Sequence, residues 1–96
     1  MTIKLPITPE LLEVASKVVW FKSPQDTLSN PVHFLAYLMT YGVHEDVQIV
    51  YKYLTLKDFA AVLDNIPPGI MDPRSWAYWH VMCDKMPVPP MPKRLL

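Results

Sequence analysis

The stretch Ser23-Pro-Gln-Asp-Thr-Leu-Ser-Asn-Pro-Val-His-Phe-Leu-Ala-Tyr-Leu-Met-Thr-Tyr-Gly42 contains two helix starts and one helix end. In Ser23-Pro24 and in Asn30-Pro31, a residue that caps helices well stands directly before a proline. Proline suits the first helical position because its missing N–H needs no partner there and its φ is already helical. Gly42 is a typical residue just past a helix end. The stretch therefore predicts two consecutive helices.

The same punctuation occurs elsewhere in the chain. Thr8-Pro9 and Asp72-Pro73 repeat the pair of a cap and a proline, and Thr55 with Asp58 three residues on resembles a capping box. Apolar residues recur at helical spacing behind each of these starts. The predicted helices span residues 9–21, 24–28, 31–41, a segment from about 44, 56–65 and 73–83.

These segments predict an all-α fold, a compact bundle of four to five short helices with a Pro-rich extended C-terminal segment. A chain of 96 residues is best read as a single domain. We place the helical domain at 1–85 and the Pro-rich segment at 86–96, because prolines at this density exclude regular helix. No repeat and no convincing strand is found.

The composition favours a globular protein that binds another protein. Apolar residues make up 51% and charged residues 19%, and the aromatics comprise three Trp, five Tyr and three Phe. So many rings are hard to hide in one small core, and exposed apolar patches usually mark interfaces. An aromatic-rich core with partly exposed rims is the common alternative. The net charge of zero argues against binding to nucleic acid or anionic membranes and favours self-association or burial in a complex.

Cysteine use and hydropathy point to a cytoplasmic protein. The single Cys83 cannot form an internal disulfide, which is typical of a reducing compartment. The N-terminal residues lack the apolar run and cleavage site of a signal peptide. No run approaches 18 apolar residues, so we expect no transmembrane helix and no membrane partner.

Catalytic machinery is not evident, and we expect neither an enzyme nor a bound metal or cofactor. His80 and Cys83 stand three residues apart, but zinc sites usually need three or four ligands and no second pair is found, so a buried Cys83 and a satisfied or exposed His80 are favoured. Cys83 also lies near a helix C-terminus, which raises a thiol pKa, whereas reactive thiols favour helix N-termini. With Gly42 and Gly69 as its only glycines, the chain has no phosphate-binding loop.

A helix-turn-helix DNA-binding regulator is the alternative function. The segment 45–65 has the outline of two helices joined by a short turn. Its second helix offers Lys57 and Asn65 to DNA, but it also carries Asp58 and Asp64, which repel phosphates.

The strongest local signal is the aromatic helix that follows Asp72. Trp76, Tyr78 and Trp79 crowd one short helix, and Trp, Tyr and Arg dominate protein–protein hot spots. Both tryptophans also fit a core, and that alternative stays open. In the Pro-rich tail, the prolines either pack back onto this helix or dock into a partner groove. The predicted partner-binding residues are Arg74, Trp76, Tyr78, Trp79, Lys93 and Arg94.

A second aromatic pair ends the first predicted helix. One of Trp20 and Phe21 is easily buried, but both together are less easily buried.

Over residues 10–95 the chain resembles small uncharacterised bacterial proteins encoded beside nucleotidyltransferase-like toxins of the AbiEii/AbiGii type. The residues that carry the resemblance are Val18-Val19-Trp20 ahead of Pro24, Tyr41-Gly42 with Glu45-Asp46-Val47, Pro67-Pro68-Gly69, Asp72-Pro73-Arg74-Ser75-Trp76-Ala77-Tyr78-Trp79-His80, and Pro87-Val88-Pro89-Pro90 with Lys93-Arg94. The resemblance implies an antitoxin-like accessory protein that binds or regulates the nucleotidyltransferase. This functional inference rests on the neighbourhood of the genes. The other expected assembly is a homo-oligomer.

Overall fold

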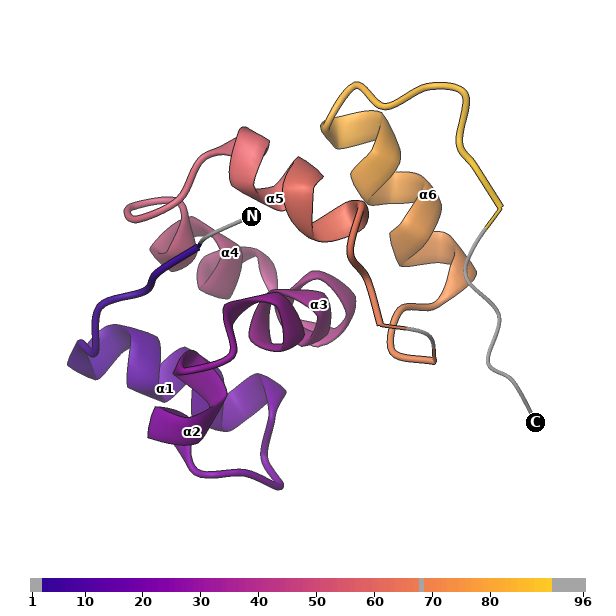
Figure 1. The fold of residues 1–96 in the computed structure, drawn as a ribbon. Helices are drawn as coiled ribbons and strands as arrows, with labels where there is room; N and C mark the ends of the chain where they lie inside the picture. Colours follow the sequence, from indigo (N-terminus) through magenta and orange to yellow (C-terminus); the bar gives the residue numbers. More distant parts are fainter. Residues whose placement is uncertain (1–2, 68, 91–96) are drawn as a thin grey trace.

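The computed structural model of the protein describes residues 3–67 and 69–90, which form six α-helices and no strand (Figure 1). The all-α prediction is confirmed, but the count of four to five helices is wrong, because the single turn at residues 24–28 is a separate helix with its own cap. The helices are α1 (Pro9–Val18), α2 (Pro24–Leu28), α3 (Pro31–Tyr41), α4 (His44–Val50), α5 (Leu56–Leu63) and α6 (Pro73–Met82).

The predicted caps start the helices. Thr8 Oγ1 accepts the backbone N–H of the third helical residue of α1 at 3.2 Å, and Ser23 Oγ does the same for α2 at 3.2 Å. Asp72 Oδ1 caps α6 at 2.7 Å. Thr55 and Asp58 form the predicted box, in which Thr55 N donates to Asp58 Oδ2 at 2.8 Å. Each side chain satisfies a backbone N–H that a helix start leaves without a partner.

Helix ends depart from the predictions by a few residues. The helix predicted over 9–21 stops at Val18, which leaves Trp20 and Phe21 in the connection to α2. Gly42 ends α3 as predicted, but its backbone is extended, with φ of −69°. Glycine is needed there because a Cβ would lie 2.7 Å from the backbone oxygen of Leu38.

Helix α3 is the centre of the fold, and it packs against all five other helices (Figure 1). The buried face of α3 follows its helical period, since Phe34, Leu35 and Leu38 are fully buried and Met39 nearly so. Two apolar residues at helix starts are exposed. Val43 caps α4 and is 56% exposed, and Leu56 is the first residue of α5 and is 41% exposed, because both stand before the buried face of their helix begins.

Two polar clusters join α1 to the α4 region. Lys17 Nζ lies 2.8 Å from Oδ1 of the buried Asp46, whose Oδ2 accepts the backbone N–H at the start of α4. This pairing with Asp46 raises the pKa of Lys17. At the other end of α1, Glu10 accepts hydrogen bonds from the Tyr53 hydroxyl and from Lys52 Nζ, and these bonds lower its pKa. Together these contacts orient α4 on α1.

The described part of the Pro-rich segment packs back onto α6. Residues 86–90 form neither helix nor strand, and the backbone oxygen of Pro89 accepts the indole N–H of Trp76 at 2.8 Å. Val88 lies against the core. The packed reading therefore holds up to residue 90, while residues 91–96, with Lys93 and Arg94, lie outside the described residues. An extended segment over the whole of 86–96 is not established.

The sequence predicts that the chain has no transmembrane helix. Among the described residues, none of the helices has the length and apolar character that spanning a membrane requires.

Removing the cap of α6 tests the local account of the helix starts. Asp72→Ala is expected to lower the free energy of unfolding by about 1 kcal/mol at neutral pH, the usual worth of an N-cap. Hydrogen bonds from Ser75, first from its backbone N–H, lower the pKa of Asp72. The stabilisation is therefore present above the unfolded-state pKa of about 4 and is lost as the pH falls through the lowered native value.

Urea denaturation at several pH values measures this difference. Asp72→Asn is the matched control, because it keeps a capping oxygen without the titrating charge. An equal loss of stability at neutral pH in both variants would contradict the assignment of Asp72 as the cap.

Candidate functional site

The predicted partner-binding residues on α6 divide into core and surface. Trp76 and Trp79 are 6% and 4% exposed, so both belong to the core. Their assignment as partner anchors is therefore corrected to core packing, the alternative left open by the sequence. Arg74 and Tyr78 are exposed, Tyr78 at 56%. Trp76 and Trp79 are three residues apart and therefore lie on the same side of α6. This side faces α5 and α3, which bury both rings.

Trp79 joins three helices. Its ring stacks on Phe59 of α5, with centroids 5.1 Å apart and planes 16° from parallel. Its indole Nε1 donates to the backbone oxygen of Met39 at 2.8 Å. Met39 stands in the last turn of α3, where helix carbonyls lack a partner within the helix. Trp79 thus supplies a hydrogen bond to a backbone carbonyl at the C-terminal end of α3.

His80 and Cys83 contact neighbouring backbone groups of the protein. His80 is 1% exposed, and its Nδ1 lies 2.7 Å from the backbone oxygen of Trp76. Burial raises the pKa of the Cys83 thiol, with Lys85 opposing the shift. The thiol Sγ lies 3.8 Å from the backbone oxygen of Leu56. A thiol with a raised pKa is a poor nucleophile. The described residues contain no group of three or more His, Cys, Asp or Glu suited to a metal ion.

The two helices of the predicted helix-turn-helix do not pack against each other. Helices α4 and α5 pack on α3 but not on each other, whereas the two helices of this motif must pack together. The Asn65 side chain donates to the backbone oxygen of Ala61 at 2.9 Å. It is therefore engaged within its own segment.

Four aromatic side chains form a continuous surface feature that we call the aromatic strip: Trp20, Phe21, Tyr37 and Tyr41. Successive ring centroids lie 5.5, 5.7 and 5.9 Å apart. Trp20 is 81% exposed, Tyr41 63% and Phe21 51%. Trp20 and Phe21 come from the α1–α2 connection, and the tyrosines come from α3. A small cavity of about 260 Å³ opens among these rings.

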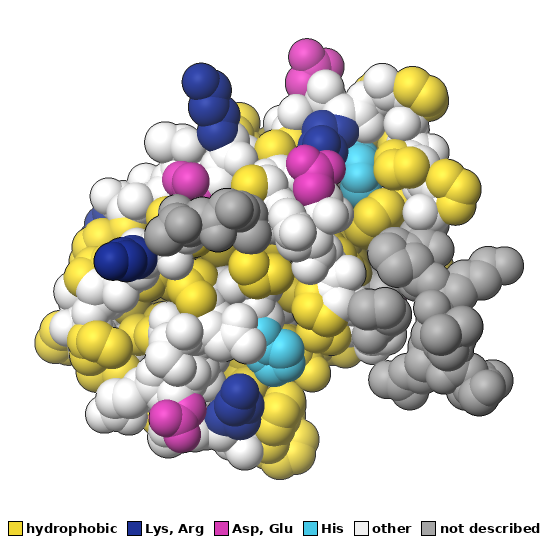
Figure 2. Space-filling view, viewed as in Figure 1, with side chains coloured by type: hydrophobic (Ala, Val, Ile, Leu, Met, Phe, Trp, Pro, Cys, Tyr) yellow, Lys and Arg dark blue, Asp and Glu magenta, His cyan; other side chains and the backbone are white. Residues whose placement is uncertain are grey.

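Basic residue types stand beside the aromatic strip. Lys17, which is paired with Asp46, borders the cavity of the strip. His33 packs on Tyr37 with ring centroids 4.9 Å apart, and burial, with the nearby Lys22 as a smaller cause, lowers its pKa. In Figure 2 hydrophobic side chains group at the lower edge of the molecule, where Figure 1 places the α1–α2 connection.

The sequence pointed to half of the aromatic strip. It singled out Trp20 and Phe21 as hard to bury together, and the structure leaves both exposed. It missed Tyr37 and Tyr41. Their spacing could have revealed them. His33, Tyr37 and Tyr41 follow one another at intervals of four residues, which puts all three rings on one side of α3, opposite its buried face.

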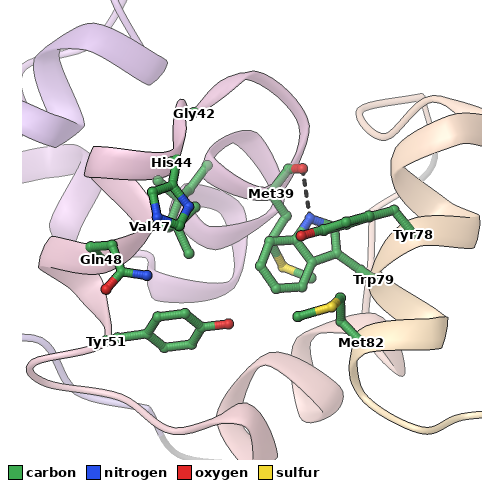
Figure 3. A pocket seen from close by; sticks show the side chains of 10 residues that line it. Met39, Gly42, His44, Val47, Gln48, Tyr51, Tyr78, Trp79 and Met82 are labelled. Carbon is green, nitrogen blue, oxygen red and sulfur yellow. Dashed lines mark hydrogen bonds between the residues drawn. The ribbon is translucent and has the colours of Figure 1, made fainter.

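A second cavity, of about 310 Å³, lies between α6 and the helices α3 and α4 (Figure 3). Its walls are Leu38, Met39, Gly42, His44, Val47, Gln48, Tyr51, Tyr78, Trp79 and Met82. Side chains from α4 and from Tyr51, which follows it, face those from α6 across the space. It shares no residue with the aromatic strip.

Comparison with known proteins gives no match: neither a protein-family model, nor a curated protein, nor a solved structure is significantly similar to this chain.

Proposed function

We propose that this chain is a non-catalytic accessory protein that binds another protein through the aromatic strip. The observation that carries the proposal is the exposure of Trp20 at 81% beside three further rings. A folded domain that buries Trp76 and Trp79 has room in its core for aromatic side chains, yet these four rings stay at or near the surface. Exposed aromatic clusters of this kind are typical of interaction sites.

The position of the aromatic strip suits a binding surface. Its tyrosines stand on α3, which the other five helices hold in place, so the rings are presented by a rigid element. Rigid aromatic side chains lose little conformational entropy on binding. Lys22 follows Phe21 directly and acts on the nearby His33, and its charge favours a partner that surrounds an apolar contact with carboxylates, whereas the charge of Lys17 is already paired with Asp46.

The proposed partner is the nucleotidyltransferase-like toxin that the sequence resemblance implies, which would make this chain antitoxin-like. The raised pKa of Cys83 and the buried, hydrogen-bonded His80 support a role without nucleophilic catalysis by these residues. A second copy of the chain is the competing occupant of the strip, and the experiment below separates the two.

Light scattering after size exclusion tests this function. The full chain is measured alone and after co-expression with the product of the neighbouring gene. We expect a monomer alone and a stable heterocomplex on co-expression. A homodimer alone that excludes the co-expressed protein would assign the strip to self-association. A monomer in both experiments would overturn the proposal of this partner.

A further inference from the structure

We propose that the cavity between α4 and α6 is a binding site for an uncharged planar ring that carries a hydrogen-bonding group. The inference goes beyond the proposed function, because the site is separate from the aromatic strip and needs no protein partner. It rests on the shape of the cavity, on the rings that line it and on polar side chains without internal partners.

Aromatic rings line the cavity at steep angles to one another. Tyr78 stands perpendicular to Trp79, with an interplanar angle of 90° and centroids 5.4 Å apart. Tyr51 is inclined by 74° to Phe59, and Phe59 is nearly parallel to Trp79, so Tyr51 also stands steeply to Trp79. The thioethers of Met39 and Met82 complete the apolar wall (Figure 3). Rings and thioethers both contact planar aromatic ligands favourably.

Four polar side chains surround the same space: His44, Gln48, Tyr51 and Tyr78. In Figure 3 the Tyr51 hydroxyl and the amide of Gln48 point into the gap between the helices. His44, Gln48 and Tyr78 are exposed and Tyr51 is half-buried, and within the described part of the chain no hydrogen bond or ion pair to another residue involves these four side chains. Their donors and acceptors are therefore available to a ligand, which fixes its orientation by such contacts.

The charge of the lining selects a neutral ligand. No Lys, Arg, Asp or Glu lines the cavity. Burial raises the pKa of Tyr51, which keeps its hydroxyl protonated and able to donate. A charged ligand would lose its hydration without gaining an opposite charge, so a neutral molecule is favoured.

The volume selects a small ligand. About 310 Å³ is at the lower end of the range for ligand pockets. It suits one ring or two fused rings, such as an indole or a nucleobase. The chemistry shared by these two is a flat apolar face with a polar edge. The occupant we propose is a free heterocycle, because the site is a small pocket separate from the aromatic strip.

The tryptophan indole N–H signals provide the readout. The three tryptophans sit in different places: Trp79 lines the cavity, Trp76 donates to Pro89, and Trp20 is in the aromatic strip. The full ¹⁵N-labelled chain is titrated with indole and, separately, with adenine. We expect the Trp79 signal to shift with a Kd of about 1 mM or below, as befits ligands this small, while the Trp76 signal stays in place.

Two variants make the site specific. Gln48→Ala is expected to weaken binding roughly 5-fold or more, the loss of a hydrogen bond, whereas Gln25→Ala on α2 is a matched control without effect. Met82→Trp is expected to fill the cavity and to abolish the shift of Trp79.

Each outcome either supports the site or overturns it. A shift of the Trp79 signal with indole, with adenine or with both supports the site, and the probe with the lower Kd identifies the preferred ring. No shift of Trp79 with either probe, or shifts that survive Met82→Trp in a folded variant, would overturn the inference.

Discussion

Replacing Trp79 with alanine is expected to lower the free energy of unfolding by about 3–5 kcal/mol, the usual cost of truncating a buried tryptophan. The side chain is 4% exposed, stacks on Phe59 and donates a hydrogen bond to the backbone oxygen of Met39 at the end of α3. Its loss leaves a cavity between three helices and a carbonyl without its partner. Small domains have about 5–15 kcal/mol in total, so this variant is expected to be marginally folded.

The neighbouring residue supplies the control for this substitution. Tyr78 is 56% exposed and touches Trp79 edge to face, so Tyr78→Ala is expected to cost less than about 1 kcal/mol. Urea denaturation followed by circular dichroism measures both variants. Equal midpoints for the two variants would contradict the placement of Trp79 in the core and would restore it as a candidate anchor for a partner.

Replacing Trp20 with alanine is expected to weaken partner binding about 30-fold, or roughly 2 kcal/mol, the loss typical of a hot-spot tryptophan. The free energy of unfolding is expected to stay within about 0.5 kcal/mol of the parent, because the side chain is 81% exposed. Phe21→Ala, at the next ring of the strip, is expected to act in the same direction. Isothermal titration calorimetry with the co-encoded protein measures the affinity.

An exposed apolar residue on another helix is the matched control for the Trp20 variant. Val81 on α6 is 60% exposed and lines neither the strip nor the cavity, so Val81→Ala is expected to leave the affinity unchanged. If Tyr78→Ala and not Trp20→Ala released the partner, the contact surface would lie on α6, as the sequence motif first indicated. The Trp79 and Trp20 variants thus separate loss of fold from loss of binding.

Half of the candidate surface was visible in the sequence. Trp20 and Phe21 stood out because two large rings at one helix end are difficult to bury together, and both are exposed. Tyr37 and Tyr41 did not stand out, since tyrosines on an apolar helix fit a buried face equally well. Which face of α3 remains free depends on where the other five helices pack, and the positions of those helices are set by residues far along the chain.

The aromatic motif of α6 shows the opposite error. Its composition resembles a hot spot, but hot spots and cores use the same large side chains. Spacing put Trp76 and Trp79 on one side of the helix and Tyr78 on another, and it did not tell which side meets α5 and α3. The cavity between α4 and α6 was equally invisible, because its lining comes from segments about 30 residues apart in the sequence.

The sequence by itself determined the helix starts and the inner face of the central helix. Caps such as Thr8, Ser23 and Asp72 act on backbone groups within three residues, and the buried stripe of α3 follows from its own period. These are local effects, and a linear chain displays them. Only the tertiary structure decided that Trp79 is buried and Trp20 exposed. Burial depends on which distant helix covers a side chain, so two tryptophans, both predicted within helices, have opposite exposures.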